Sequence, residues 1–84
     1  MKRIDPNKYN LTSRTTLYKK MDDIFIIIDR KSRIIMKDGH RIMAMVRAIQ
    51  SAEKNQTVSV LTSAQVCSKT RMFLYDNNVD VNRL

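Results

Sequence analysis

The sequence contains few of the residues from which most enzyme sites are built. Its 84 residues include one cysteine, one glycine, one proline, one histidine and no tryptophan. A lone cysteine excludes an intrachain disulfide, and with a single histidine it cannot assemble a zinc site. One glycine excludes a glycine-rich phosphate-binding loop, and no Ser-His-Asp set is visible. We therefore expect no metal site, no cofactor and no catalytic residue, which favours a non-enzymatic protein.

Long apolar runs are missing as well. The longest wholly apolar stretch is Ile24–Ile28, whereas a membrane-spanning helix needs roughly 20 such residues. The N-terminal residues are charged and no apolar run follows them, so they do not resemble a signal peptide. The unpaired Cys67 fits a reducing compartment. These observations predict a cytoplasmic protein with no membrane partner.

Acidic residues are scarce beside basic ones. The chain has 16 Lys and Arg against eight Asp and Glu, which gives a net charge of +8 and an isoelectric point near 10.1. Six of the basic residues lie within residues 1–20, where Asp5 is the only acid. Such an electropositive segment attracts polyanions. A nucleic acid is the favoured partner, while a purely solubilising role and contact with an acidic protein or membrane surface are the alternatives.

The order of the expected elements indicates a small single-domain α/β fold, with α+β as an alternative. Ile42, Val46 and Ile49 recur at helical spacing, whereas β-branched residues with apolar–polar alternation indicate strands. The expected elements are a basic, flexible arm over 1–11, a short helix over 14–21, strands over 24–28 and 33–37 joined as a hairpin, a helix over 40–55, a strand over 57–62, a helix over 62–76 and a strand over 79–81.

After the arm, residues 12–84 are therefore predicted to form one ββαβαβ domain. A sheet of about four strands, partly parallel, would be packed by two main helices. The short helix over 14–21 would precede this sheet. The abundance of Asn, Lys, Ile and Met with almost no glycine is typical of AT-rich genomes, such as those of phages and mobile elements.

The basic groups of the arm, the short helix and the hairpin tip are predicted to contact phosphates of DNA or RNA. Two tyrosines interleaved with these lysines could stack on the bases of a single strand. The candidate nucleic-acid-binding residues are Lys2, Arg3, Lys8, Tyr9, Arg14, Tyr18, Lys19, Lys20, Arg30, Lys31 and Arg33.

Three short stretches resemble motifs of known families. The run Ser13–Tyr18 with the basic hairpin after it resembles the DNA-binding domains of MerR and excisionase proteins, which implies a helix against a groove and a wing on phosphates. Asp29-Arg30-Lys31 after an apolar strand resembles PD-(D/E)xK nucleases, which implies Mg²⁺ held by carboxylates and a lysine that orients water. The region Val58–Val81 resembles the first strand and helix of glutaredoxins, with Cys67 at the resolving position.

These readings leave three function classes open. The favoured one is a non-enzymatic nucleic-acid-binding protein that contacts the phosphate backbone. The second is a protein–protein interaction or homodimerisation module, which a thin core, several methionines and an unpaired strand edge would suit. The third is a Mg²⁺-dependent nuclease of the PD-(D/E)xK kind, in which Asp29 and Lys31 would carry the chemistry.

Overall fold

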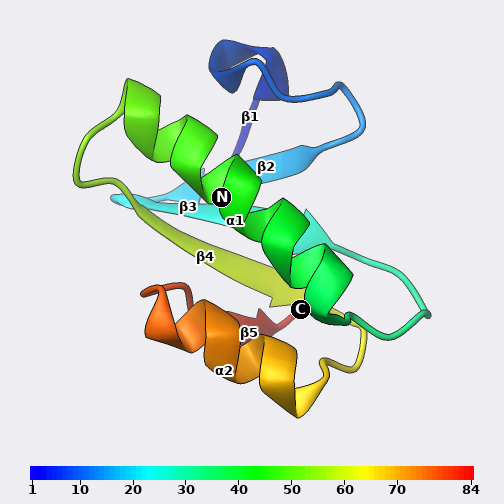
Figure 1. Cartoon of the computed structure of the whole chain (residues 1–84). Helices are drawn as coiled ribbons and strands as arrows, with labels where there is room; N and C mark the ends of the chain where they lie inside the picture. The colour runs from blue at the N-terminus through cyan, green and yellow to red at the C-terminus, as the bar shows by residue number, and fades with distance from the viewer.

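A five-stranded mixed sheet runs through the computed structural model, which describes all residues 1–84 (Figure 1). The strands are β1 (Lys2–Ile4), β2 (Thr16–Lys20), β3 (Asp23–Ile28), β4 (Thr57–Thr62) and β5 (Val81–Arg83), and the helices are the 3-10 helix η1 (Pro6–Tyr9), α1 (Met36–Ala52) and α2 (Ser68–Asp76). The strands are neighbours in chain order. Strands β1, β2 and β3 pair antiparallel, whereas β3, β4 and β5 pair parallel.

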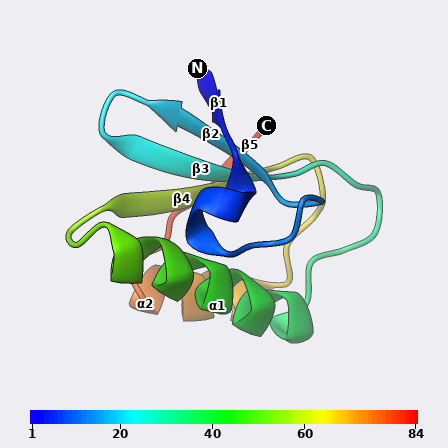
Figure 2. The ribbon, with the colours of Figure 1, turned by 90° about the horizontal axis from the view of Figure 1, so that it is seen from above.

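The two parallel connections place both helices on one side of the sheet (Figure 2). Helix α1 joins β3 to β4, and α2 joins β4 to β5. Both crossovers step in the same direction across the sheet, and crossovers of this kind are almost always right-handed, so both helices pack on the same face. The predicted α/β class and ββαβαβ order are confirmed. The sheet has five strands instead of about four because β1 and β2 were not predicted as strands, whereas one predicted strand, over residues 33–37, does not form.

The core lies between the sheet and the helices. Alternate residues of the strands point toward α1 and α2 because side chains alternate across a strand. Leu17 of β2 and Ile26 of β3 are almost wholly buried there, and Val46 and Leu74 of the helices belong to the same buried cluster. Fourteen buried apolar residues form this single cluster, which accounts for one hydrophobic core in a chain of this length.

The short helix predicted over residues 14–21 is wrong, because this segment forms β2. Leu17 is buried and its neighbour Tyr18 faces the other side of the sheet, which is strand alternation. Met21, the last residue of the predicted helix, has a left-handed backbone (φ 56°) in the turn to β3 and is 86% exposed. The hairpin of this protein is therefore β2–β3.

Residues 1–11, predicted as a basic arm that precedes the folded domain, are part of the same folded unit. Strand β1 pairs with β2 along its whole length. Pro6 occupies the first turn of η1, where the missing N–H costs little, and Asp5 caps that turn by accepting a hydrogen bond from the Asn7 N–H at 2.9 Å. Tyr9 then enters the core with only 4% of its surface exposed.

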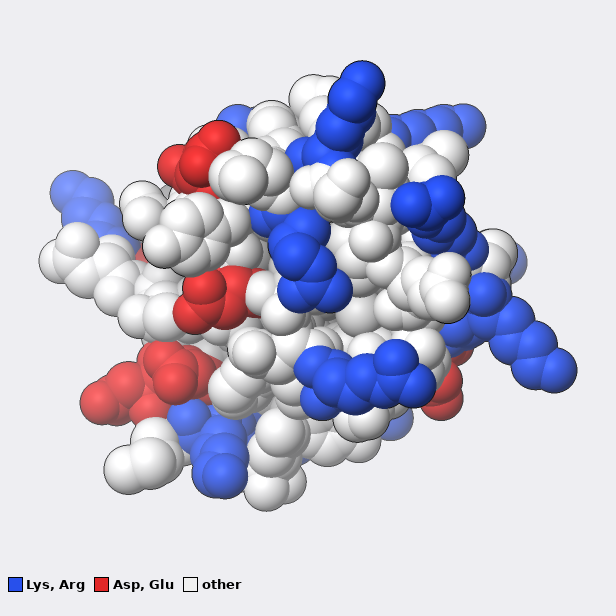
Figure 3. Space-filling model, turned by 90° about the horizontal axis from the view of Figure 1, so that it is seen from below, with Lys and Arg blue, Asp and Glu red and all other residues white.

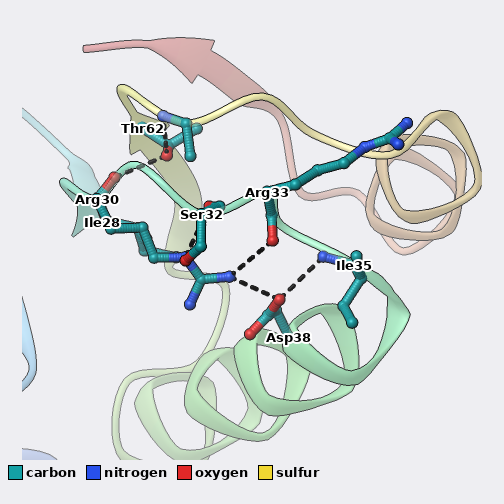
Figure 4. Close-up of polar contacts among 8 residues, drawn as sticks. Ile28, Arg30, Ser32, Arg33, Ile35, Asp38 and Thr62 are labelled. Atoms are coloured by element: carbon teal, nitrogen blue, oxygen red, sulfur yellow. Dashed lines mark hydrogen bonds and ion pairs between the residues drawn. The ribbon is translucent and has the colours of Figure 1, made fainter.

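The predicted strand over residues 33–37 is also wrong. Ile34 makes one isolated parallel bridge with Val66, and α1 begins at Met36 instead of residue 40. Asp38, expected to lie before the helix, lies in its first turn and accepts hydrogen bonds from the Ile35 N–H at 2.9 Å and the Arg30 guanidinium at 2.7 Å (Figure 4). The carboxylate thus holds the loop onto the helix N-terminus.

The C-terminal elements begin later than predicted. Helix α2 begins at Ser68 instead of residue 62. The Thr62 hydroxyl accepts a hydrogen bond from the Ala64 N–H at 3.0 Å and donates one to the Ile28 carbonyl at 2.7 Å. The last strand covers residues 81–83, not 79–81. Neither α1 nor α2 combines the length and hydropathy that a membrane span requires.

Removing the Asp38 carboxylate tests how firmly the loop between β3 and α1 is held against the start of the helix. The Arg30 hydrogen bond outweighs burial and lowers the pKa of Asp38 from its ordinary value near 3.8. Asp38→Ala should reduce the free energy of unfolding by about 1–2 kcal/mol at pH 7. Because the folded-state pKa is lowered, this contribution is present above about pH 4 and is lost at lower pH. Urea unfolding at pH 7 and pH 2 measures both effects.

The matched control is Asp22→Ala, which removes an exposed acid whose side chain makes no hydrogen bond. It should change stability by less than about 0.5 kcal/mol at either pH. An Asp38→Ala loss of the same size at both pH values would show that the charge of the carboxylate is not what holds the loop.

Candidate nucleic-acid interface

The face of the sheet opposite the helices is uncovered (Figure 2). The strand registers show which side chains share it, since neighbouring residues in register point to the same side. We call this surface the open sheet face; it comprises Arg3, Thr16, Tyr18, Lys20, Asp23, Phe25, Ile27, Thr57, Ser59, Leu61 and Asn82.

Apolar side chains occupy the centre of the open sheet face. Tyr18 lies directly across from Phe25, and Ile27 lies directly across from Leu61. Phe25 and Ile27 are two residues apart on β3, so the four side chains adjoin one another. All four remain partly exposed. An apolar surface rimmed by polar groups is typical of a binding surface.

Positive charge flanks the aromatic pair. Arg3 is the cross-strand neighbour of Tyr18 on the β1 side, and Lys20 follows Tyr18 by two residues on the same face. Both are exposed, and neither belongs to one of the two ion pairs of the structure. Asp23, across from Lys20, is the only acid on this face. The aromatic pair is therefore bordered by cations that are free to contact an anionic ligand.

Three of the eleven predicted site residues meet on this face, namely Arg3, Tyr18 and Lys20. Lys2 and Lys19 pair with each other across β1 and β2, on the helix side of the sheet. The structure therefore separates lysines that are consecutive in sequence, because alternation along a strand sends them to opposite faces.

Tyr9 and Lys8, two of the predicted ligand residues, both contact Glu53. The Tyr9 hydroxyl donates to Glu53 Oε2 at 2.6 Å, and Lys8 Nζ lies 3.0 Å from the same oxygen. Burial, followed by the hydrogen bond to Glu53, raises the pKa of Tyr9 to about 12. With 4% of its surface exposed, Tyr9 has no ring face available for a base, so the stacking prediction is wrong for this residue.

The cations of the predicted hairpin tip, Arg30, Lys31 and Arg33, do not form one cluster. Arg30 donates to the carbonyl oxygens of Ser32 at 3.1 Å and Arg33 at 3.2 Å, besides its ion pair with Asp38 (Figure 4). These bonds order the loop and occupy the guanidinium. Lys31 is exposed in the same loop, while the side chain of Arg33 extends away from this network toward α2 (Figure 4).

Arg14 lies apart from both groups. It is exposed in the loop before β2 and lines a cleft of about 470 Å³ between that loop, the end of β3 and α1. Arg41 and Met45 of α1 form the opposite wall. The cleft also contains Asp29 and Asp38, so its positive charge is offset and it is less suited to a polyanion than the open sheet face.

Sequence reasoning missed Phe25, Ile27 and Leu61. The run Ile24–Ile28 predicts a strand buried on both faces, because every residue in it is apolar. The structure buries Ile24 and Ile26 but leaves Phe25 and Ile27 partly exposed. The available signal was the period-two spacing of Thr16, Tyr18 and Lys20 in β2, which indicates a polar face of the sheet that its neighbour β3 shares.

The motifs that resembled other families are not arranged as those families require. The segment Ser13–Tyr18 contains no helix. Asp29 accepts a hydrogen bond from the Ser63 hydroxyl at 2.6 Å, Asp38 is paired with Arg30, and no three acid, His or Cys side chains are close enough to hold a metal ion. Asp29 and Asp38 line the same cleft, but the second of these carboxylates is engaged by Arg30 and no third ligand stands with them.

Cys67 lies immediately before α2 and is partly exposed. Hydrogen bonds from the backbone N–H groups of Lys69 and Thr70 lower the pKa of its thiol, as expected at a helix N-terminus. Ala64, which takes the position of the nucleophilic cysteine in the glutaredoxin comparison, is buried. A second thiol for disulfide exchange is absent from the sequence.

No protein-family model matches the sequence, and neither the curated proteins nor the solved structures compared with it gave a match. The family resemblances therefore depend on short motifs alone. Within this chain, the open sheet face brings the rings of Tyr18 and Phe25 together with the cations of Arg3 and Lys20.

The buried Tyr9 makes stability depend on alkaline pH. Because its folded-state pKa is about 12, whereas an unfolded tyrosine titrates near 10, its contribution is complete below about pH 10 and is lost as pH rises toward 12. Tyr9→Phe should remove this loss, which is about 1.4 kcal/mol of unfolding free energy for each pH unit between pH 10 and 12. Tyr75→Phe, a change at a tyrosine that is 67% exposed, should leave the curve unchanged. The urea midpoint of each variant, measured at intervals between pH 9 and 12, gives its dependence of stability on pH. The same dependence in both variants would contradict the raised pKa of Tyr9.

Proposed function

We propose that this protein binds single-stranded nucleic acid on the open sheet face. The observation that carries the proposal is the cross-strand pair Tyr18–Phe25, which lies on an uncovered face beside Arg3 and Lys20. Bases would stack on the two rings while the two cations contact phosphates. No bond is made or broken, so the role is non-enzymatic.

The physical argument concerns what a flat aromatic surface can recognise. Every base has a π-face, so stacking on Tyr18 and Phe25 requires no particular sequence and contributes about 1–3 kcal/mol per base. In a duplex these faces are covered by neighbouring bases, so only an unpaired strand or loop presents them. Both DNA and RNA satisfy this requirement, and the surface therefore favours single strands of either kind.

Electrostatics supports the same partner. The net charge of +8 draws polyanions to the molecule as a whole. On the open sheet face, Arg3 and Lys20 make no ion pair, so no intramolecular contact has to break before they bind phosphate. An apolar partner protein would gain nothing from these two cations, whereas a nucleic acid uses the rings and the charges together.

Replacing the aromatic pair tests the stacking contacts. Tyr18→Ala and Phe25→Ala should each weaken binding of a short single-stranded oligonucleotide about 5- to 150-fold, which corresponds to about 1–3 kcal/mol per base. Tyr75→Ala removes an exposed ring from α2 and should have no effect. Fluorescence anisotropy with a labelled oligonucleotide measures affinity, and circular dichroism verifies the fold. Equal losses in all three variants would place the binding site elsewhere.

The phosphate contacts are tested separately by salt dependence. The logarithm of affinity should fall linearly with the logarithm of salt concentration, by about 0.7 for each phosphate contact on a single strand. The double variant Arg3→Gln with Lys20→Gln should make this slope shallower by about 1.4. The control is Arg47→Gln with Lys54→Gln, which removes the same charge from exposed positions off this face. A slope that responds equally to both pairs would mean that net charge alone, not the open sheet face, binds the strand.

Self-association is a second candidate, favoured by the pair Ile27–Leu61 at the centre of the same face. Two copies that met through this face would bury the apolar pair, but they would also bring Arg3 and Lys20 of each copy close together. Sedimentation at several protein concentrations distinguishes the two functions. A dimer that dissociates in Ile27→Lys and forms whether or not oligonucleotide is present would favour self-association.

A further inference from the structure

A second positive surface lies at the far edge of the sheet from β1. It is a pocket of about 510 Å³ at the carboxyl ends of the parallel strands β4 and β5, beside the N-terminal half of α2. Three arginines and no acidic residue line it. The lining residues that matter here are Arg33, Gln65, Arg71, Asn82 and Arg83.

The fold brings these arginines together from three separate segments. The Ile34 N–H donates to the Gln65 carbonyl at 2.8 Å and the Cys67 N–H donates to the Ile34 carbonyl at 2.9 Å, which fixes the loop carrying Arg33 against the loop before α2. Arg71 of α2 donates from Nη1 to the Val81 carbonyl at 3.0 Å. This bond holds one guanidinium over β5 while its remaining N–H groups stay available.

Arg83 completes the pocket from β5. It is the partner of Thr62 in the β4–β5 pairing, and the Leu84 N–H donates to the Thr62 carbonyl at 2.9 Å. The segment that carries Arg83 is thus held in the sheet. Figure 3 shows the side of the molecule on which α2 and β5 lie, where several basic side chains project across the surface and acidic ones lie mainly toward one side.

Three cations that line one hollow repel one another, and no acidic side chain lines the hollow with them. None of the three arginines belongs to an ion pair, and the pocket has no acid. The pKa of the Cys67 thiol is lowered mainly by hydrogen bonds from the N–H groups of Lys69 and Thr70. The charge of Arg33 lowers this pKa further. A positive field therefore extends across the pocket to the start of α2, where an anion is favoured.

We propose that this pocket binds a phosphomonoester group. A guanidinium presents paired N–H donors to phosphate oxygens, and a phosphomonoester offers three terminal oxygens and close to two negative charges at pH 7. A backbone phosphodiester offers one charge and fewer free oxygens, so it matches three arginines less well. The phosphate belongs either to the 5′ end of a nucleic acid or to a small phosphorylated molecule, and both present the same group to the pocket.

Inorganic phosphate is the first probe. Wild-type protein should bind it with millimolar or tighter affinity by isothermal titration calorimetry, and Arg33→Gln and Arg83→Gln should each weaken binding at least about tenfold, as expected for a lost charge-assisted hydrogen bond. Arg71 is left unchanged because it also bonds to β5. Arg47→Gln, at an exposed arginine of α1, should bind phosphate like wild type. No binding by wild type, or equal weakening in Arg47→Gln, would overturn the proposal.

Cys67 supplies a second measurement within the native chain. A phosphate held beside Arg33 would offset the positive field at the thiol, so the pKa of Cys67 should rise and its alkylation by iodoacetamide at pH 7 should slow. The effect should disappear in Arg33→Gln. A rate that phosphate leaves unchanged in the wild type would place any bound phosphate away from this pocket and contradict the assignment.

Paired oligonucleotides identify the source of the phosphate. If the ligand is a nucleic-acid end, the 5′-phosphorylated form of an oligonucleotide should bind more tightly than its 5′-hydroxyl form, and Arg33→Gln should abolish the difference. If both forms bind equally while inorganic phosphate still binds, the ligand is a small phosphorylated molecule. Tyr18→Ala and Phe25→Ala should leave phosphate binding unchanged, so failure of this site and failure of the open sheet face are measured independently.

Discussion

Both parallel connections cross the sheet in the same direction, and most of the architecture follows from that constraint. Because right-handed crossovers place α1 and α2 on one side, a chain of 84 residues can build one core only, between those helices and the sheet. The other face receives no cover. Partly exposed side chains such as Phe25 and Leu61 on that face are thus a consequence of topology, and the same topology makes the face available to a ligand.

The sequence was sufficient to predict the elements that combine strong periodicity with length. The helix containing Ile42, Val46 and Ile49 and the strand beginning at Thr57 are where the pattern indicated. The short segments were ambiguous for a physical reason. Leu17 and Met21 are spaced for one helical face, but the same residues also fit a strand followed by a turn. Pairing with β1 and β3, which no local pattern reveals, decides in favour of the strand.

The candidate site was predictable in composition but not in arrangement. Counting charges indicates a polyanion partner, yet the positions of the charges depend on alternation and on tertiary bonds. Lys19 and Lys20 are adjacent in sequence and lie on opposite sides of the sheet. Arg30 was a reasonable phosphate ligand until Asp38 proved to be 2.7 Å away. Arg71 and Arg83 were missed because their proximity to Arg33 depends on the packing of α2 and β5 against a distant loop.

The two edge strands also restrict how this molecule meets other chains. Strands β1 and β5 each contain three residues, so an extended peptide laid alongside either of them would gain few main-chain hydrogen bonds. Sheet extension into fibres or swapped oligomers is correspondingly disfavoured. Partners are therefore directed to the broad surfaces of the molecule, where they lie across several strands at once and are selected by side-chain chemistry instead of by backbone complementarity.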